Sequence, residues 1–177
     1  MNGRTCVSIV EMSLMQRIKS GWPVATELVE TMPGPPEVVW RLITDWENQG
    51  DWQLEARDFV VKSAAREGVG VTAEATVSIG GITTRDAIEV VAWTPNEHLA
   101  IEHKGWVSGR GDIRLTPLAS GAHPERTHVL WIETLYPPLG LAGAVGLTVF
   151  KPLMTRTFKR DLRVLQGLVR AATQGPP

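Results

Sequence analysis

Residues 69–79 alternate strictly between apolar and polar side chains, and this pattern limits what the chain can fold into. The apolar members are Val69, Val71, Ala73, Ala75, Val77 and Ile79. Because successive side chains of a strand point to opposite faces, a period of two predicts a β-strand with one buried face and one face in water. The pair Gly80-Gly81 follows at once and indicates a hairpin turn. We therefore expect an antiparallel sheet with one apolar face, and that face needs a cover.

Further strands are predicted on both sides of this segment. They span Val24–Thr31, Arg57–Ala64, Ile82–Trp93, Glu97–Lys104, Trp106–Leu115 and Thr127–Tyr136. Residues 117–125 are polar and are expected to form a loop. In the strand that begins at Trp106, Gly109 and Gly111 fall on the apolar face. Glycine at such a position either leaves room for a neighbour or marks a bulge.

Two helical regions complete the order of elements. A short helix is predicted from Pro35, because proline is favourable in the first helical turn. Residues 46–52 then form a turn or a second short helix. Residues 139–172 carry a long amphipathic pattern, which can cover a sheet that curves around it, and Pro152 is expected to kink this helix near its start. Its apolar positions include Phe150, Met154, Phe158, Leu165, Leu168 and Val169.

Composition argues against several classes of protein. The chain has 177 residues and a formal net charge of −1, so nothing in its charge favours a polyanionic partner. Cys6 is the only cysteine, which rules out an internal disulfide and a cysteine-based metal site and favours the cytoplasm. Residues 1–22 lack the pattern of a signal peptide, and we interpret them as an N-terminal extension that is either poorly ordered or helical. Residues 23–173 are predicted to form a single domain.

Three parts of the chain together resemble a known family. They are Pro35–Trp52, Glu89–Leu99, and Tyr136–Gly140 with Phe158–Leu165. In this order and spacing the chain is similar to the START-like helix-grip superfamily, in particular its polyketide cyclase/dehydrase and lipid-transport members. The resemblance implies an α+β fold, in which a curved antiparallel sheet of about seven strands wraps around a long C-terminal helix. It also implies one or two short helices after the first strand, and a cavity between the sheet and the long helix.

The same resemblance implies two functions. One is the binding of a hydrophobic small molecule, such as a lipid, a quinone or an aromatic polyketide, without catalysis. The alternative is a polyketide cyclase or dehydratase that uses one or two acid–base residues in the cavity and no metal or nucleotide cofactor. The family has no universal catalytic motif, so the resemblance assigns no catalytic residue. Two or more candidate residues converging on one cavity would favour the enzyme, and a purely apolar cavity would favour the binder.

Four residues are candidates for catalysis. His103 alternates with Ile101 and is interpreted either as a satisfied inward histidine or as a group that contacts the ligand, in both cases dispensable for the fold. Asp86 shares the apolar face of its strand, and we expect a bulge to turn it outward or an arginine to pair with it; entry into the cavity is the alternative. Glu133 lies in a strand whose inward face the pattern leaves open. Tyr136 stands near the expected mouth, where it packs or positions a ligand.

The predicted ligand-binding residues are mostly aromatic and aliphatic. They are Trp40, Trp52, Ile88, Ile101, His103, Trp131, Tyr136, Phe150, Met154 and Phe158. The mouth of the cavity is expected between residues 140–146 and residues 46–52. Asp161 falls on the apolar side of the last helix, where an unpaired charge would be costly. We therefore expect it to pair with a basic group or a backbone donor, or to lie at the exposed margin.

No other cofactor or partner is indicated. The histidines form no metal-ligand pattern, and no nucleotide-binding motif is present, so neither a metal nor a nucleic acid is predicted. A basic stripe on the last helix either faces solvent or contacts an anionic membrane surface. It consists of Lys151, Arg156, Lys159, Arg160, Arg163 and Arg170. The pattern leaves the oligomeric state open.

Overall fold

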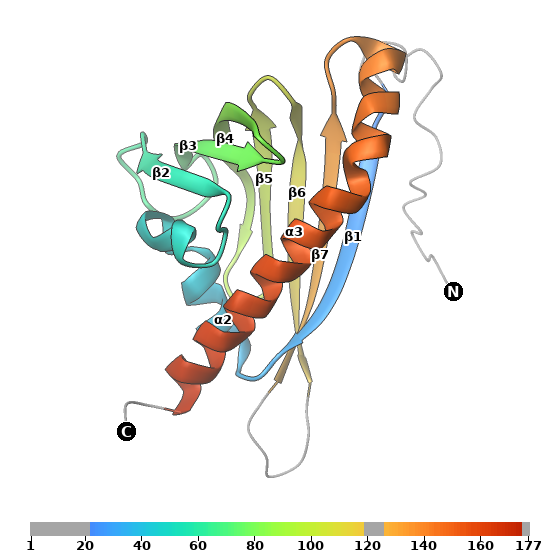
Figure 1. Cartoon of the computed structure of the whole chain (residues 1–177). Coiled ribbons are helices and arrows are strands. Elements are labelled where there is room, and N and C mark those ends of the chain that lie inside the picture. The colour runs from blue at the N-terminus through green and yellow to red at the C-terminus, as the bar shows by residue number, and fades with distance from the viewer. Residues whose placement is uncertain (1–21, 119–125, 175–177) are drawn as a thin grey trace, which may run out of the picture.

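The computed structural model describes residues 22–118 and 126–174, and its elements follow the predicted order (Figure 1). The strands are β1 (Val24–Met32), β2 (Ala56–Val61), β3 (Thr72–Ile79), β4 (Ile82–Thr94), β5 (His98–Lys104), β6 (Ser108–Leu118) and β7 (Arg126–Tyr136). The helices are α2 (Pro36–Ile43), the short 3₁₀ helix η1 (Trp46–Asp51) and α3 (Gly140–Gln174). The predicted extension, apart from Trp22, and most of the predicted loop at 117–125 lie outside the described residues.

All seven strands form one antiparallel sheet in the order β1-β7-β6-β5-β4-β3-β2. Strands β2 to β7 are a meander, in which each strand pairs with the next one in the chain. Strand β1 joins the other edge by pairing with β7, with Leu28 opposite Trp131. The first strand therefore lies beside the last strand, and the two short helices connect it to the opposite edge of the sheet.

Helix α3 crosses the concave face of the sheet (Figure 1). Its buried face includes Phe158, Leu162, Leu165 and Val169, which belong to one core cluster with inward residues of the sheet such as Val129. Burial of each such side chain contributes roughly 1.5–3 kcal/mol. The predicted helix-grip α+β fold is therefore confirmed: one amphipathic helix covers the apolar face of a curved sheet.

Two strand boundaries differ from the prediction for a local reason. Strand β3 begins at Thr72 rather than at residue 69, because Gly68 and Gly70 have positive φ angles of 92° and 90° that break the extended backbone. Strand β6 continues through Pro117, which pairs with Thr127 of β7. Pairing with β5 ends near Arg114, so the missing N–H of Pro117 faces no strand on that side.

The start of α3 depends on a glycine. A Cβ atom at Gly143 would stand only 1.8 Å from the carbonyl oxygen of Pro138, whereas a Cβ at Gly146 would meet no atom within 4 Å. We expect Gly143→Ala to lower the free energy of unfolding by about 1–3 kcal/mol, because the backbone must shift. Gly146→Ala is the matched control and should raise it by up to about 1 kcal/mol through helix propensity. Urea denaturation measures both, and equal effects would contradict the packing described here.

Candidate functional site

A cavity of about 590 Å³ lies between the concave face of the sheet and the first half of α3. Strands β2 to β7, α2, η1 and the segments that follow η1 and precede α3 contribute the rest of its wall. Pockets that hold small organic ligands in proteins typically measure roughly 300–1,000 Å³. The cavity is therefore large enough for a molecule of two to four fused rings or for a short acyl chain.

The wall is predominantly apolar, and eight of the ten predicted ligand-binding residues belong to it. They are Trp52, Ile88, Ile101, His103, Trp131, Phe150, Met154 and Phe158. Trp40 does not line the cavity, because it packs edge-on against Trp93 with 4.9 Å between the ring centroids. Tyr136 also lies off the wall. Leu135, its neighbour in β7, faces the cavity, so Tyr136 falls on the other side of the strand.

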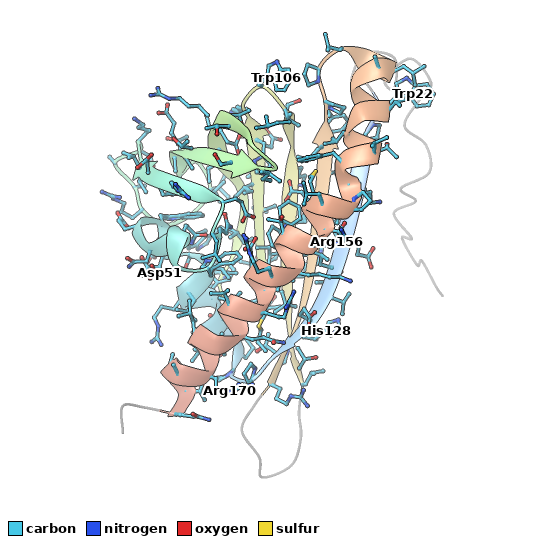
Figure 2. All side chains as sticks on the ribbon, in the orientation of Figure 1. Trp22, Asp51, Trp106, His128, Arg156 and Arg170 are labelled. Atoms are coloured by element: carbon cyan, nitrogen blue, oxygen red, sulfur yellow. The ribbon has the colours of Figure 1, made fainter. Side chains whose placement is uncertain are left out.

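The mouth is marked by wall residues with large exposed fractions. Ile82, Trp106 and Leu139 are 56%, 65% and 80% exposed. They come from the β3–β4 hairpin, the β5–β6 turn and the residue before α3, and Figure 2 shows Trp106 at the same end of the molecule as the start of α3. The prediction that residues 140–146 border the mouth agrees with this placement. The prediction for residues 46–52 is wrong, because Trp46 and Trp52 are buried and form an inner wall.

Three of the four catalytic candidates meet in this wall. His103 Nδ1 donates a hydrogen bond to Asp86 Oδ2 over 2.6 Å. On the other side of the ring, His103 Nε2 lies 3.0 Å from Glu133 Oε1, but the N–H is not aimed at that oxygen. The indole N–H of Trp131 donates to Glu133 Oε2 over 3.1 Å. The result is an imidazole between two carboxylates, with one ring N–H and the Asp86 Oδ1 atom free of hydrogen bonds to described residues.

The charge state of His103 follows from this arrangement. Burial of the ring is the largest single influence and disfavours the charged form. The charge of Glu133, the hydrogen bond to Asp86 and the close approach of Glu133 to Nε2 together outweigh burial and raise the pKa of His103 to about 10. His103 is therefore an imidazolium at neutral pH, and the wall of a predominantly apolar cavity carries a proton donor beside two acceptors.

The sheet register explains how three separate strands reach one point. Glu133 of β7 lies opposite Gly111 of β6, and Gly111 lies opposite Ile101 of β5. A Cβ atom at Gly111 would stand 3.0 Å from Glu133 Oε2 and 3.2 Å from Ile101 Cγ1. The missing side chain at Gly111 thus lets the Glu133 carboxylate extend across β6 towards His103. Of the two roles open to this glycine, it leaves room, since the β5–β6 and β6–β7 pairings contain no bulge.

The favoured expectation for Asp86 is wrong. Asp86 neither turns outward nor pairs with an arginine; it lines the cavity and binds His103. The only irregularity between β4 and β5 falls between Val90 and Ala92, which is beyond Asp86 along the strand. The open question about β7 is also answered, because Thr127, Val129, Trp131 and Glu133 are its buried residues.

A second charged cluster joins the segment after η1 to α3. Arg160 Nη2 lies 2.6 Å from Glu55 Oε2 and 3.1 Å from Asp161 Oδ1. The expectation that Asp161 pairs with a basic group is confirmed, and Asp161 is 0% exposed. Arg160 is part of the predicted basic stripe, yet it turns back to these carboxyl groups. Burial, followed by the neighbouring Asp161 carboxyl, raises the pKa of Glu55 to about 8.

Glu55, which also lines the cavity, was not among the predicted site residues. It lies in a turn between η1 and β2, where no periodic pattern shows which way a side chain points. The only signal in the sequence was indirect: a carboxylate at Asp161 on an apolar helix face needs a partner from another segment.

Neither a metal site nor a membrane span is found in the described ranges 22–118 and 126–174. No group of three or more histidine, cysteine or carboxylate side chains there is arranged to hold a metal ion. No helix in the same ranges combines the length and the apolar character that crossing a membrane requires.

Comparison with known proteins defines the class. The profile of the family described as "Polyketide cyclase / dehydrase and lipid transport" matches residues 23–170. The chain belongs to this family. None of the curated proteins matches it in sequence.

Solved structures share the fold at low sequence identity. The protein TTHA0849 from Thermus thermophilus is 22% identical, with a TM-score of 0.70, over 85% of this chain and 99% of that one. The Zhui aromatase/cyclase from Streptomyces sp. R1128 is 15% identical, with a TM-score of 0.70, over 84% and 94%. A START superfamily protein from Mycobacterium smegmatis is 15% identical, with a TM-score of 0.68, over 82% and 97%. At these identities the likeness supports the fold.

Proposed function

We propose that this protein is an acid–base enzyme of the cyclase or dehydratase type, acting on a hydrophobic small molecule that carries keto or hydroxyl groups. The observation that carries the proposal is the meeting of Asp86, His103 and Glu133 in the wall of one apolar cavity. The sequence alone slightly favours simple binding over catalysis. The convergence of three candidates reverses that order, because a cavity that only stores an apolar ligand has no use for a charged triad.

Each member of the triad has a distinct role in this proposal. The imidazolium of His103 directs its Nε2 proton to a substrate oxygen, since that N–H is not committed to Glu133. Asp86 holds the ring in place through Nδ1 and stabilises its charge. Glu133, next to Nε2, is the base that removes a proton from the carbon beside a carbonyl group. The apolar wall excludes water, which strengthens these electrostatic interactions.

The proton balance closes within the triad. In dehydration, Glu133 takes the proton from the carbon next to the carbonyl, a carbon–carbon double bond forms, and the hydroxyl leaves as water with the proton from His103. In ring closure, the same carbon attacks a second carbonyl carbon, and that carbonyl oxygen takes the proton from His103. Glu133 then returns its proton to His103 across 3.0 Å. No electrons are gained or lost, so the chemistry requires no redox partner.

A model β-hydroxyketone tests this activity. We expect the protein to dehydrate 4-hydroxy-4-(6-methoxynaphthalen-2-yl)butan-2-one to the conjugated enone, followed by absorbance and by mass spectrometry. Glu133→Gln should slow the reaction about 100-fold or more, the typical contribution of a general base, while binding of the compound, measured by calorimetry, changes little. Glu102→Gln is the matched control, because Glu102 is an exposed carboxylate on the same strand as His103, and it should leave the rate unchanged.

The second candidate is a carrier of a hydrophobic molecule, and one observation favours it. Both nitrogens of His103 already lie within 3.0 Å of a carboxylate oxygen, so the triad could be a closed structural network. Tight binding of the β-hydroxyketone with no acceleration over buffer would support the carrier and contradict the enzyme. Mass spectrometry of an organic extract of the purified protein would then identify the chemical class of its cargo.

Two further proposals concern the cellular compartment and contact with a membrane surface. We retain the cytoplasm as the expected compartment, on the basis of the lone Cys6. Contact of α3 with an anionic membrane surface also remains a proposal. The exposed basic residues Arg156, Lys159, Arg163 and Arg170 support it, whereas Arg160 is already engaged by carboxyl groups.

A further inference from the structure

The carboxyl groups of the cavity wall lie in two separate places. One is the triad on the sheet. The other is Glu55, which lines the cavity and whose side chain is 8% exposed. The backbone of Glu55 accepts a hydrogen bond from Ser78 of β3, and Asp86 of β4 lies opposite Ala75 of β3. Glu55 and Asp86 therefore lie on opposite sides of β3, two strand spacings apart across the sheet. They are also offset by three residues along the strand direction, from Ser78 to Ala75, so their backbones are roughly 10–15 Å apart.

The surface between the two places is mostly apolar. Ala75 and Val77 of β3 line the cavity there, and Thr84 of β4 lies opposite Val77. The described residues show no hydrogen bond or ion pair that links Glu55 to any member of the triad. A ligand that reaches both places must consequently have an apolar middle and two polar positions that are well separated.

The composition of the Glu55 cluster indicates that its role is not purely structural. One guanidinium, that of Arg160, faces two carboxyl groups, so one acidic group is in excess. Asp161 is fully buried and lies off the cavity wall, and its Oδ1 atom already pairs with Arg160. Glu55 is the surplus carboxyl and the one that the cavity reaches. Because its pKa is raised to about 8 by burial and by Asp161, Glu55 retains a proton at neutral pH and can both donate and accept hydrogen bonds.

We propose that Glu55 forms a second polar subsite of the cavity, and that the natural ligand is an extended apolar molecule with oxygen-bearing groups at two separated positions. One group meets the triad and the other meets Glu55. This inference rests on the proposed function to the extent that a ligand must enter this cavity. It narrows the ligand to compounds with a rigid or extended apolar body, such as fused rings with an oxygen at each end, and it disfavours a fatty acid with one polar end.

Two matched probes test the subsite by calorimetry. 2,6-Dihydroxynaphthalene has a hydroxyl group at each end, and 6-methyl-2-naphthol replaces one of them with a methyl group of similar size. The ratio of their dissociation constants measures the contribution of the second hydroxyl. We expect Glu55→Leu to shift this ratio about two- to tenfold against the dihydroxy compound, as expected for the loss of one hydrogen bond. Glu55→Gln, which still donates and accepts, should shift it less than twofold.

Controls separate the possible failures. Glu47→Leu removes an exposed carboxylate from η1 that pairs with Arg66 outside the cavity, and it should leave the ratio unchanged. An unchanged ratio in Glu55→Leu, with both probes still bound, would overturn the subsite and leave the proposed function intact. Failure of the wild-type protein to bind either probe would contradict the proposed function and, with it, the subsite.

A measurement on the wild-type protein covers the case in which Glu55→Leu does not fold. With ¹³C-labelled glutamate carboxyl groups, 2,6-dihydroxynaphthalene should shift the Glu55 resonance, whereas the resonance of exposed Glu47 should not move. A Glu55 resonance that stays fixed while the probe binds would overturn the inference without any substitution.

Discussion

Replacement of His103 by phenylalanine should lower the free energy of unfolding by about 3–5 kcal/mol, the typical cost of leaving a buried charge without its partner. The ring lies between Asp86 Oδ2 at 2.6 Å and Glu133 Oε1 at 3.0 Å, and both carboxyl groups are largely buried. Phenylalanine would preserve the shape of the ring but leave two carboxylates facing each other across an apolar wall. Urea denaturation at neutral pH measures the loss.

A second histidine provides the matched control for this substitution. His98 also lies on β5 and pairs with one carboxylate, Asp112. Asp112 keeps Arg110 as a partner at 2.6 Å, so His98→Phe should cost less than about 1 kcal/mol. The combination His103→Phe, Asp86→Asn and Glu133→Gln removes the unpaired charges and should recover much of the loss. A cost for His103→Phe no larger than that for His98→Phe would contradict the proposed charge state of the triad.

The stability of the protein should also fall as the pH rises from about 5 to about 10, because two groups bind a proton more tightly in the folded state than in the unfolded state. The folded-state pKa of His103 is about 10, against 6.5 for a free histidine. Its stabilising contribution is therefore complete below pH 6.5 and is lost as the pH rises through 10. The pKa of Glu55 is about 8, against 4.5, so folding requires a proton that the unfolded chain releases above pH 4.5. Both groups act in the same direction.

Denaturation curves recorded at intervals of one pH unit separate the two groups. Glu55→Gln should flatten the decline between about pH 4.5 and 8, because the amide does not titrate, and should leave the decline above pH 8 in place. Glu102→Gln, at an exposed position, should alter neither part. A stability that rises between pH 6 and 9 in the wild-type protein would mean that neither proton is held in the folded state.

The fold could be predicted from the sequence because its main signals are repetitive. The period of two in residues 69–79 and the helical period in residues 139–172 each repeat over many positions, so errors at single residues do not change the assignment. Strands β2 to β7 pair as a meander, in which each strand lies beside its neighbour in the chain, whereas the pairing of β1 with β7 has no local signal in the sequence. The predicted strand boundaries are wrong where the conformation of single residues determines where a strand ends. Gly68 and Gly70, for example, have positive φ angles that delay the start of β3.

The candidate site was predictable only in part, because each side chain there depends on a partner from another strand. His103 was correctly placed on the inner face by alternation alone. The expectation that Asp86 turns outward or pairs with an arginine is wrong because His103, from another strand, pairs with it, and the pattern of one strand cannot show that partner. Glu55 lay outside any periodic pattern, and its partners come from α3, over 100 residues further along the chain.

The glycine at position 111 has a consequence for how the site comes into being. The triad takes its charged groups from β4, β5 and β7 and its empty space from β6, so four of the seven strands must be paired before the imidazole has both of its neighbours. No segment of the unfolded chain holds a precursor of the site. Assembly of the site is therefore a late event in folding, because contacts that are distant in sequence form after local ones. A ligand held there would bind only the fully paired sheet. It would therefore stabilise the whole sheet rather than one loop.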